Sequence, residues 1–161
     1  MTRIDLLEQL RAVTAEVTAD LIMPVKPQKD DGGKAPVSRA ADVFLMRLPD
    51  SKSAGKKAPY IIHQLITSKD VQTAGQREQA EAVVRSIFCV YNDDEQEGGL
   101  MLLNLMERLR LTLLRKVVIA KRYQLNLEAG LECLVYPDDT APFFAGEMVS
   151  TWKLPAIERE V

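Results

Sequence analysis

Few side chains in this sequence could do covalent or metal chemistry, and their spacing assembles no familiar reactive group. The single histidine, His63, follows Ile62 in a strand-like run, with no serine or cysteine motif placed to complete a triad. Without a Cys-x-x-Cys or His-x-x-x-His pair, one histidine cannot supply the ligands of a zinc site. We interpret His63 as a satisfied or partly exposed structural histidine, with a catalytic base as the alternative.

Glycine pairs and acidic clusters would be the parts of a phosphate or cation site. Gly32-Gly33 and Gly98-Gly99 lack the spacing of a P-loop or a dinucleotide-binding turn, so we interpret them as loop glycines. The acidic clusters are Asp30-Asp31, Asp93-Asp94-Glu95 and Asp138-Asp139. They lack EF-hand spacing, and turns commonly contain such residues. The sequence predicts no cofactor, no metal and no enzymatic activity.

A basic group offers the one plausible contact with phosphate: Arg108, Arg110, Arg115, Lys116, Lys121 and Arg122. Two interpretations stay open, namely contact with a nucleic-acid backbone or charges at a helix C-terminus and on a solvated face. Trp152, near the end of an apolar strand, is either a core residue or an interface anchor. The candidate interface residues are Trp152, Arg108, Arg110, Arg115, Lys116, Arg122, Asp93, Asp94 and Glu95.

Composition fits one globular domain over residues 1–161. Of the 161 residues, 47% are hydrophobic, which is enough for a core without approaching a membrane protein. The 21 basic and 23 acidic residues give a net charge of -2, so no overall attraction to nucleic acid or an anionic membrane is expected. No apolar run approaches the roughly 18 residues of a membrane span. The N-terminus lacks the apolar stretch of a secretory signal, so we expect a cytoplasmic protein.

The two cysteines, Cys89 and Cys133, lie inside apolar strand-like runs. Free cysteine behaves as a small hydrophobic residue. We therefore expect two buried thiols on neighbouring strands, with no disulfide.

Two segments with helical periodicity must position these residues. Residues 2–22 carry an apolar stripe on one helix face, and Pro24 ends this helix. The stripe consists of Leu6, Leu10, Val13, Val17 and Leu21. Residues 100–116 form a second, strongly apolar helix after the acidic turn 92–99, and the basic residues at its end complement the helix dipole. Its leucines cover nearly two faces. Either the sheet and the first helix cover them, or a second subunit does.

The remaining apolar runs have strand character, although a helix is the alternative for 76–85. The predicted strands are 43–46, 60–67, 81–91, 123–127, 131–136 and 143–154. Polar and glycine-containing segments between them predict mobile loops at about 24–40, 51–57 and 69–79. The predicted fold class is α+β, a mostly antiparallel sheet packed against the N-terminal helix and the apolar helix at about 100–116.

Taken in order, several segments resemble the tail terminator or tail-completion proteins of long-tailed bacteriophages. The resemblance covers about residues 59–155. The matching segments are Pro59-Tyr60-Ile61-Ile62, the turn 92–99, the helix from Leu102 to Arg110, Tyr123-Gln124-Leu125 and the run from Phe144 to Pro155. The loops 24–40 and 51–57 lie outside it.

The resemblance implies a structural virion protein that assembles into a ring, typically a hexamer, on the head-proximal end of the tail tube. Such a ring ends tube polymerisation and presents the head-joining surface. Its implied partners are copies of itself, the tail tube protein and the head-tail connector, with DNA passing through and no membrane. The implied location is the virion tail, and the host cytoplasm during assembly. Two alternatives remain, another head-tail connector or adaptor ring protein and a generic dimeric α/β ligand-binding domain.

Overall fold

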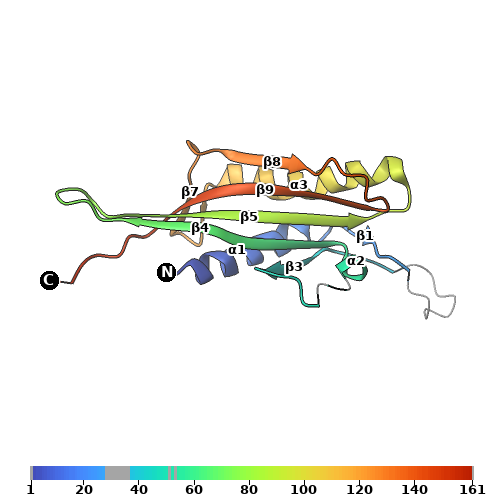
Figure 1. The fold of residues 1–161 in the computed structure, drawn as a ribbon, viewed down its shortest axis with the longest axis horizontal. Helices are drawn as coiled ribbons and strands as arrows, with labels where there is room; N and C mark the ends of the chain where they lie inside the picture. Colours follow the sequence, from blue (N-terminus) through green and yellow to red (C-terminus); the bar gives the residue numbers. More distant parts are fainter. Residues whose placement is uncertain (1, 28–36, 51, 53, 161) are drawn as a thin grey trace.

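A seven-stranded sheet carries both long helices on one face (Figure 1). The computed structural model describes residues 2–27, 37–50, 52 and 54–160. The helices are α1 (Arg3–Thr18), α2 (Ala54–Lys57) and α3 (Glu95–Lys116). The strands are β1 (Met23–Pro24), β2 (Ser38–Arg39), β3 (Asp42–Leu45), β4 (Tyr60–Val71), β5 (Gln79–Tyr91), β6 (Val118–Ile119), β7 (Tyr123–Leu125), β8 (Leu131–Val135) and β9 (Phe143–Leu154).

The strand order of the large sheet is β3-β4-β5-β9-β7-β6, and β8 also pairs with β9. Among the strand pairs of the described residues, only β3 and β4 run parallel. The predicted α+β class, with a mostly antiparallel sheet packed on two helices, is confirmed. The prediction that residues 60–67 form an interior strand is also confirmed, since β4 lies between β3 and β5.

The two long central strands, β5 and β9, set which side chains face the helices. Their register runs from Ala80 opposite Leu154 to Tyr91 opposite Phe143. Side chains alternate between the two faces of a strand, so this register puts the even-numbered residues of both strands on one face. Those of β5 from Ala80 to Val90 are all buried, as are those of β9 from Gly146 to Leu154. The core therefore lies between this face and the helices α1 and α3.

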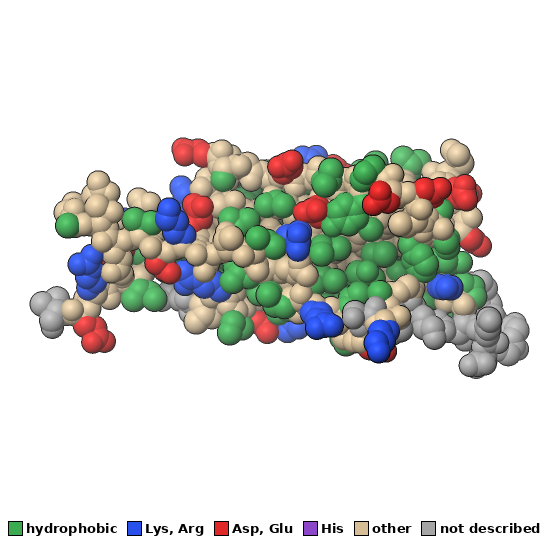
Figure 2. All heavy atoms as spheres, in the orientation of Figure 1, with side chains coloured by type: hydrophobic (Ala, Val, Ile, Leu, Met, Phe, Trp, Pro, Cys, Tyr) green, Lys and Arg blue, Asp and Glu red, His purple; other side chains and the backbone are tan. Residues whose placement is uncertain are grey.

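The other face of the sheet is only partly covered. Near α2, a second small core forms around Cys89 and Tyr91, with Phe143 packed against them. Gly55 of α2 lies close to this cluster, because a Cβ there would come 2.9 Å from the Phe143 ring. Figure 2 shows hydrophobic side chains gathered over the half of this face near α2.

The N-terminal helix is shorter than predicted, and its buried face is rotated. Thr2 caps it as expected by accepting a hydrogen bond from the Asp5 amide at 3.1 Å. The helix ends at Thr18, before the turn that leads to Pro24. Its buried face continues from Leu10 through Thr14 and Thr18, where valines at 13 and 17 were expected. Both hydroxyls bond the carbonyl four residues earlier, so these buried polar groups are satisfied.

The apolar helix begins at Glu95, about five residues earlier than predicted, because Asp94 caps it and extends the helix into the acidic turn. Gly98 is therefore a helix residue, and the interpretation of the Gly98-Gly99 pair as loop glycines is wrong. Its missing side chain has a packing reason, since a Cβ at Gly98 would lie 2.0 Å from the ring of Phe144 on β9.

All three of the predicted loops contain some regular structure. The connection at 69–79 shrinks to residues 72–78, since β4 and β5 pair as far as Val71 opposite Gln79. The helical alternative for 76–85 is wrong for the same reason. In the loop 51–57, residues 54–57 form α2, while 51 and 53 lie outside the described residues. In the loop 24–40, β1 and β2 pair at its two ends, and 28–36 lie outside the described residues.

The two adjacent helix glycines give a matched test of this packing. Gly98→Ala should lower the free energy of unfolding by about 1–3 kcal/mol, because the added methyl group meets the Phe144 ring. Gly99→Ala should instead raise it by about 0.5–1 kcal/mol, since its Cβ would have nothing within 4 Å. Urea unfolding of both variants measures the difference, and equal effects would contradict the proposed Phe144 contact.

Candidate assembly surface

Trp152 lies in the core. Its side chain is 0% exposed on the helix-facing side of β9, and its indole N–H donates to the Ser150 hydroxyl at 2.9 Å. The core interpretation is confirmed, and within this chain the Trp152 side chain offers no surface to a partner.

Two of the candidate basic residues hold α1 against the rest of the chain. Arg108 of α3 pairs with Asp20, just beyond the end of α1, at 2.8 Å. Arg122 pairs with Asp5, near the start of α1, at 2.6 Å. The Tyr123 hydroxyl also donates to Asp5, and these two donors lower the pKa of its carboxyl to about 2. Arg108 and Arg122 thus have intramolecular partners at the two ends of α1.

The other three basic candidates lie on α3. Arg110 forms a two-point ion pair with Glu107 at 2.7 and 2.8 Å, which lowers the pKa of Glu107 and raises that of Arg110. Arg115 and Lys116 are exposed in the last turn, where positive charge complements the helix dipole.

The acidic candidates lie at the opposite end of α3. The Asp94 carboxylate caps the helix by accepting from the amides of Gln96 and Glu97, at 2.9 and 3.3 Å. Asp93 and Glu95 are exposed beside it. The candidate acidic and basic residues of α3 are thus separated by the length of the helix, and the structure does not bring them together in one site.

His63 is buried inside the chain, where hydroxyl groups lie within hydrogen-bond distance of both ring nitrogens. Thr14 Oγ1 lies 2.8 Å from Nε2, and Ser86 Oγ lies 2.7 Å from Nδ1. The Thr14 hydroxyl donates to the Leu10 carbonyl, so it accepts from Nε2–H, and Nδ1 then accepts from Ser86. The ring is neutral, and burial lowers its pKa to about 4. The interpretation of His63 as a satisfied structural histidine is confirmed.

The prediction for the cysteines is half wrong. Cys89 on β5 is buried, and burial raises the pKa of its thiol. Cys133 on β8 is exposed, and β9 separates its strand from β5. The apolar run around Cys133 signals a strand, but only the tertiary structure shows that this strand lies at the rim of the sheet.

The outer face of α3 carries an uncovered stripe of leucines. Leu100, Leu103, Leu111 and Leu114 are 62%, 44%, 39% and 37% exposed, whereas the residues on the opposite side of the helix are buried. Leu100 and Leu111, and likewise Leu103 and Leu114, are eleven residues apart. Eleven residues are close to three full turns of an α-helix, so the two leucine pairs lie on the same face, and the ion-paired Glu107 lies between them. The sequence left open whether the sheet and the first helix, or a second subunit, cover the leucines of this helix. Within the chain, α1 and the sheet cover only one of its two apolar faces.

Strand β8 leaves an open sheet edge. The Tyr136 amide donates to the Ala145 carbonyl, so the alternation of an antiparallel pair turns the backbone groups of Leu131, Cys133 and Val135 away from β9. Val135, at the end of β8, lines a small hollow together with Gly99 and Leu102 of α3, so this end of the edge lies near the start of α3. Leu134 and Val135 are 50% and 44% exposed. The sequence did not predict that β8 lies at an exposed edge, because the residue pattern of a strand does not show where in the sheet that strand lies.

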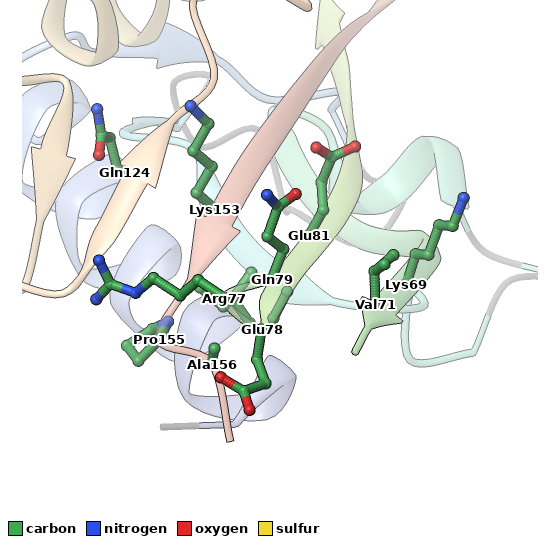
Figure 3. Close-up of a pocket in the computed structure, with 12 residues that line it drawn as sticks. Lys69, Val71, Arg77, Glu78, Gln79, Glu81, Gln124, Lys153, Pro155 and Ala156 are labelled. Atoms are coloured by element: carbon green, nitrogen blue, oxygen red, sulfur yellow. The ribbon is translucent and has the colours of Figure 1, made fainter. Parts of the chain in front are cut away.

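A hollow of about 590 Å³ lies elsewhere, where β4, β5 and β9 meet the segment after β9 (Figure 3). Charges of both signs line it. Glu81 lies opposite Lys69 on one neighbouring strand and Lys153 on the other. Alternating charge across adjacent strands stabilises a sheet surface, so this lining has a structural explanation.

No group of three or more His, Cys, Asp or Glu side chains comes together for a metal ion in the part of the chain that the structure describes. None of the helices formed by those residues is long and apolar enough to cross a membrane. No protein-family model matches the chain, and no curated protein matches its sequence. Function must therefore be argued from the surfaces above and from the sequence resemblance.

The buried His63 predicts a specific pH dependence of stability. Because its pKa falls from 6.5 to about 4 on folding, the unfolded chain binds the proton more tightly, and acid favours unfolding. The stabilisation by the neutral ring is fully present above pH 6.5 and is lost as the pH falls through 4, a change of about 3 kcal/mol.

The measurement is the free energy of unfolding of the native protein and of His63→Gln between pH 7.5 and 4. The advantage of the native protein over the variant should shrink by about 3 kcal/mol toward acid pH, since Gln does not titrate. A difference that stays constant with pH would show that His63 is not held neutral by folding.

Proposed function

We propose that this protein is a structural component of a phage virion that forms a ring, typically a hexamer, at the head-proximal end of the tail tube. There it ends tube polymerisation and presents the surface to which the head joins. Its partners are copies of itself, the tail tube protein and the head-tail connector. DNA only passes through the ring, and the protein resides in the virion tail after assembly in the host cytoplasm.

The observation that carries this proposal is the uncovered leucine stripe of α3. Four leucine side chains stay exposed on one face of the helix, and their contact with water is unfavourable. An assembly partner that covers them would remove this unfavourable contact. The leucines form two pairs on a helix that packs firmly through its other face, with the Glu107–Arg110 ion pair between them, so the surface is rigid before binding.

The folded core also suits a subunit of a ring. The hydrogen-bonded sheet makes the subunit rigid, and so do buried polar groups with partners, such as His63 and Trp152. A closed ring of identical copies needs subunits of one fixed shape. The sequence resemblance over residues 59–155 spans α3 and the strands β4, β5 and β9 that support it. Proposal and resemblance therefore point to the same part of the molecule.

The leucine stripe can be tested by solution mass. We expect the native protein to be monomeric or weakly associated when dilute and to form rings at high concentration. The double variant Leu103→Gln, Leu111→Gln should stay monomeric, while its free energy of unfolding changes by no more than about 0.5 kcal/mol per substitution because both side chains are exposed.

Ile157→Gln is the matched control, since Ile157 is 66% exposed but lies beyond β9, outside the stripe. It should assemble like the native protein in analytical ultracentrifugation. If the double variant and the control assemble equally, the stripe is not the assembly surface.

Particles produced without this protein test the function itself. Since the proposed ring halts polymerisation and joins the head, its loss should give overlong or headless tails in electron micrographs. Complementation with the native chain should restore normal particles. Normal virions in its absence would remove the proposed function.

A further inference from the structure

The charges of this chain are segregated between two regions. Residues 123–152 contain no lysine or arginine but carry five carboxylates, a net charge of -5. These are Glu128, Glu132, Asp138, Asp139 and Glu147. Residues 37–60 carry five lysines and arginines against two aspartates, a net charge of +3. For a chain whose net charge is only -2, this separation is large.

The fold places these regions at opposite rims of the sheet. The acidic region contains β8, which lies beyond β9, and the basic region contains β3, the terminal strand on the other side, together with α2 (Figure 1). Figure 2 shows acidic side chains along the upper border of the molecule and basic side chains along the lower border. Within these regions, we call residues 123–139 the acidic β8 edge, and the described residues among 37–60 the basic β3–α2 edge.

We propose that the acidic β8 edge of one copy binds the basic β3–α2 edge of the next copy, head to tail. This inference rests on the proposed ring function and names the two surfaces that meet at each joint. Opposite charges select this pairing, because a symmetric contact between two β8 edges would bring like charges together. Contacts between two different surfaces repeat around an axis and can close into a ring.

Backbone geometry at both rims fits such a joint. On the β8 edge, the backbone groups of Leu131, Cys133 and Val135 point away from β9 and can accept a further strand. On β3, the amides of Asp42 and Met46 donate toward β4, at the Pro59 and His63 carbonyls. The alternate residues between them therefore turn their amides away from β4.

Exposed apolar side chains lie beside the charges on both rims. Leu134 and Val135 of β8 are 50% and 44% exposed, and Met46, directly after β3, is 49% exposed. Burying them against each other would add short-range attraction to the electrostatic steering.

Native Cys133 provides a crosslinking probe at the acidic edge. In Pro49→Cys, a second exposed thiol is placed on the basic edge without changing its charge. Under mild oxidation at a concentration where rings form, disulfides between position 49 and Cys133 should produce a ladder of dimers, trimers and larger species. Cys89 is buried and stays outside this reaction.

Two controls separate the possible arrangements. Glu16→Cys places the second thiol on the exposed side of α1, opposite the face that packs on the sheet, and should give no ladder. The unmodified protein should not crosslink, whereas efficient dimers through Cys133 alone would show a symmetric β8 contact and overturn the proposal. A ladder no stronger for Pro49→Cys than for Glu16→Cys would overturn it as well.

A charge reversal measures the electrostatic contribution to the proposed contact between the two edges. Glu132→Lys should raise the dissociation constant of self-association roughly tenfold at low salt, and the effect should fade near 1 M salt. Glu16→Lys, with the same charge change on α1, should leave association unchanged. If rings form on tail tubes while both rim variants behave like their controls, this inference fails and the proposed function stands. If no rings form on tubes at any concentration, the proposed function itself fails.

Discussion

The register between β5 and β9 is the constraint on which the rest of this structure depends. These strands pair over the full 12 residues of β9, and a slip of one residue would turn every buried side chain of either strand to the other face. Phe88, Met148 and Trp152 all face the helices in the observed register. The positions of α1 and α3, and through them the exposed surfaces, follow from that single alignment.

The histidine and two of the arginines that could have taken part in chemistry or phosphate binding are paired within the chain. His63 is held between hydroxyls of α1 and β5, and its neutral ring joins helix to sheet. Arg108 and Arg122 bind carboxylates at either end of α1. Residues that could have contacted a phosphate or a substrate instead fix the first helix in place.

What remains exposed is suited to contact with other proteins. α3 is apolar on two sides but has a sheet and a helix against only one of them. β8 pairs with β9 on one side and leaves its outer backbone groups at the rim. Because charges of opposite sign collect at opposite rims, the sheet has two complementary edges. A body with a rigid centre and unlike edges is suited to repeated head-to-tail packing.

The sequence by itself determined the kinds of elements and most of their faces. Alternation in β9 and helical periodicity in residues 100–116 depend only on neighbours along the chain, so both were predictable. Where Cys133 lies, why Gly98 belongs to a helix and which face of α3 stays uncovered were decided by the tertiary structure. Each of these depends on a partner distant in sequence, such as Phe144 against Gly98, and local periodicity carries no information about contacts of that kind.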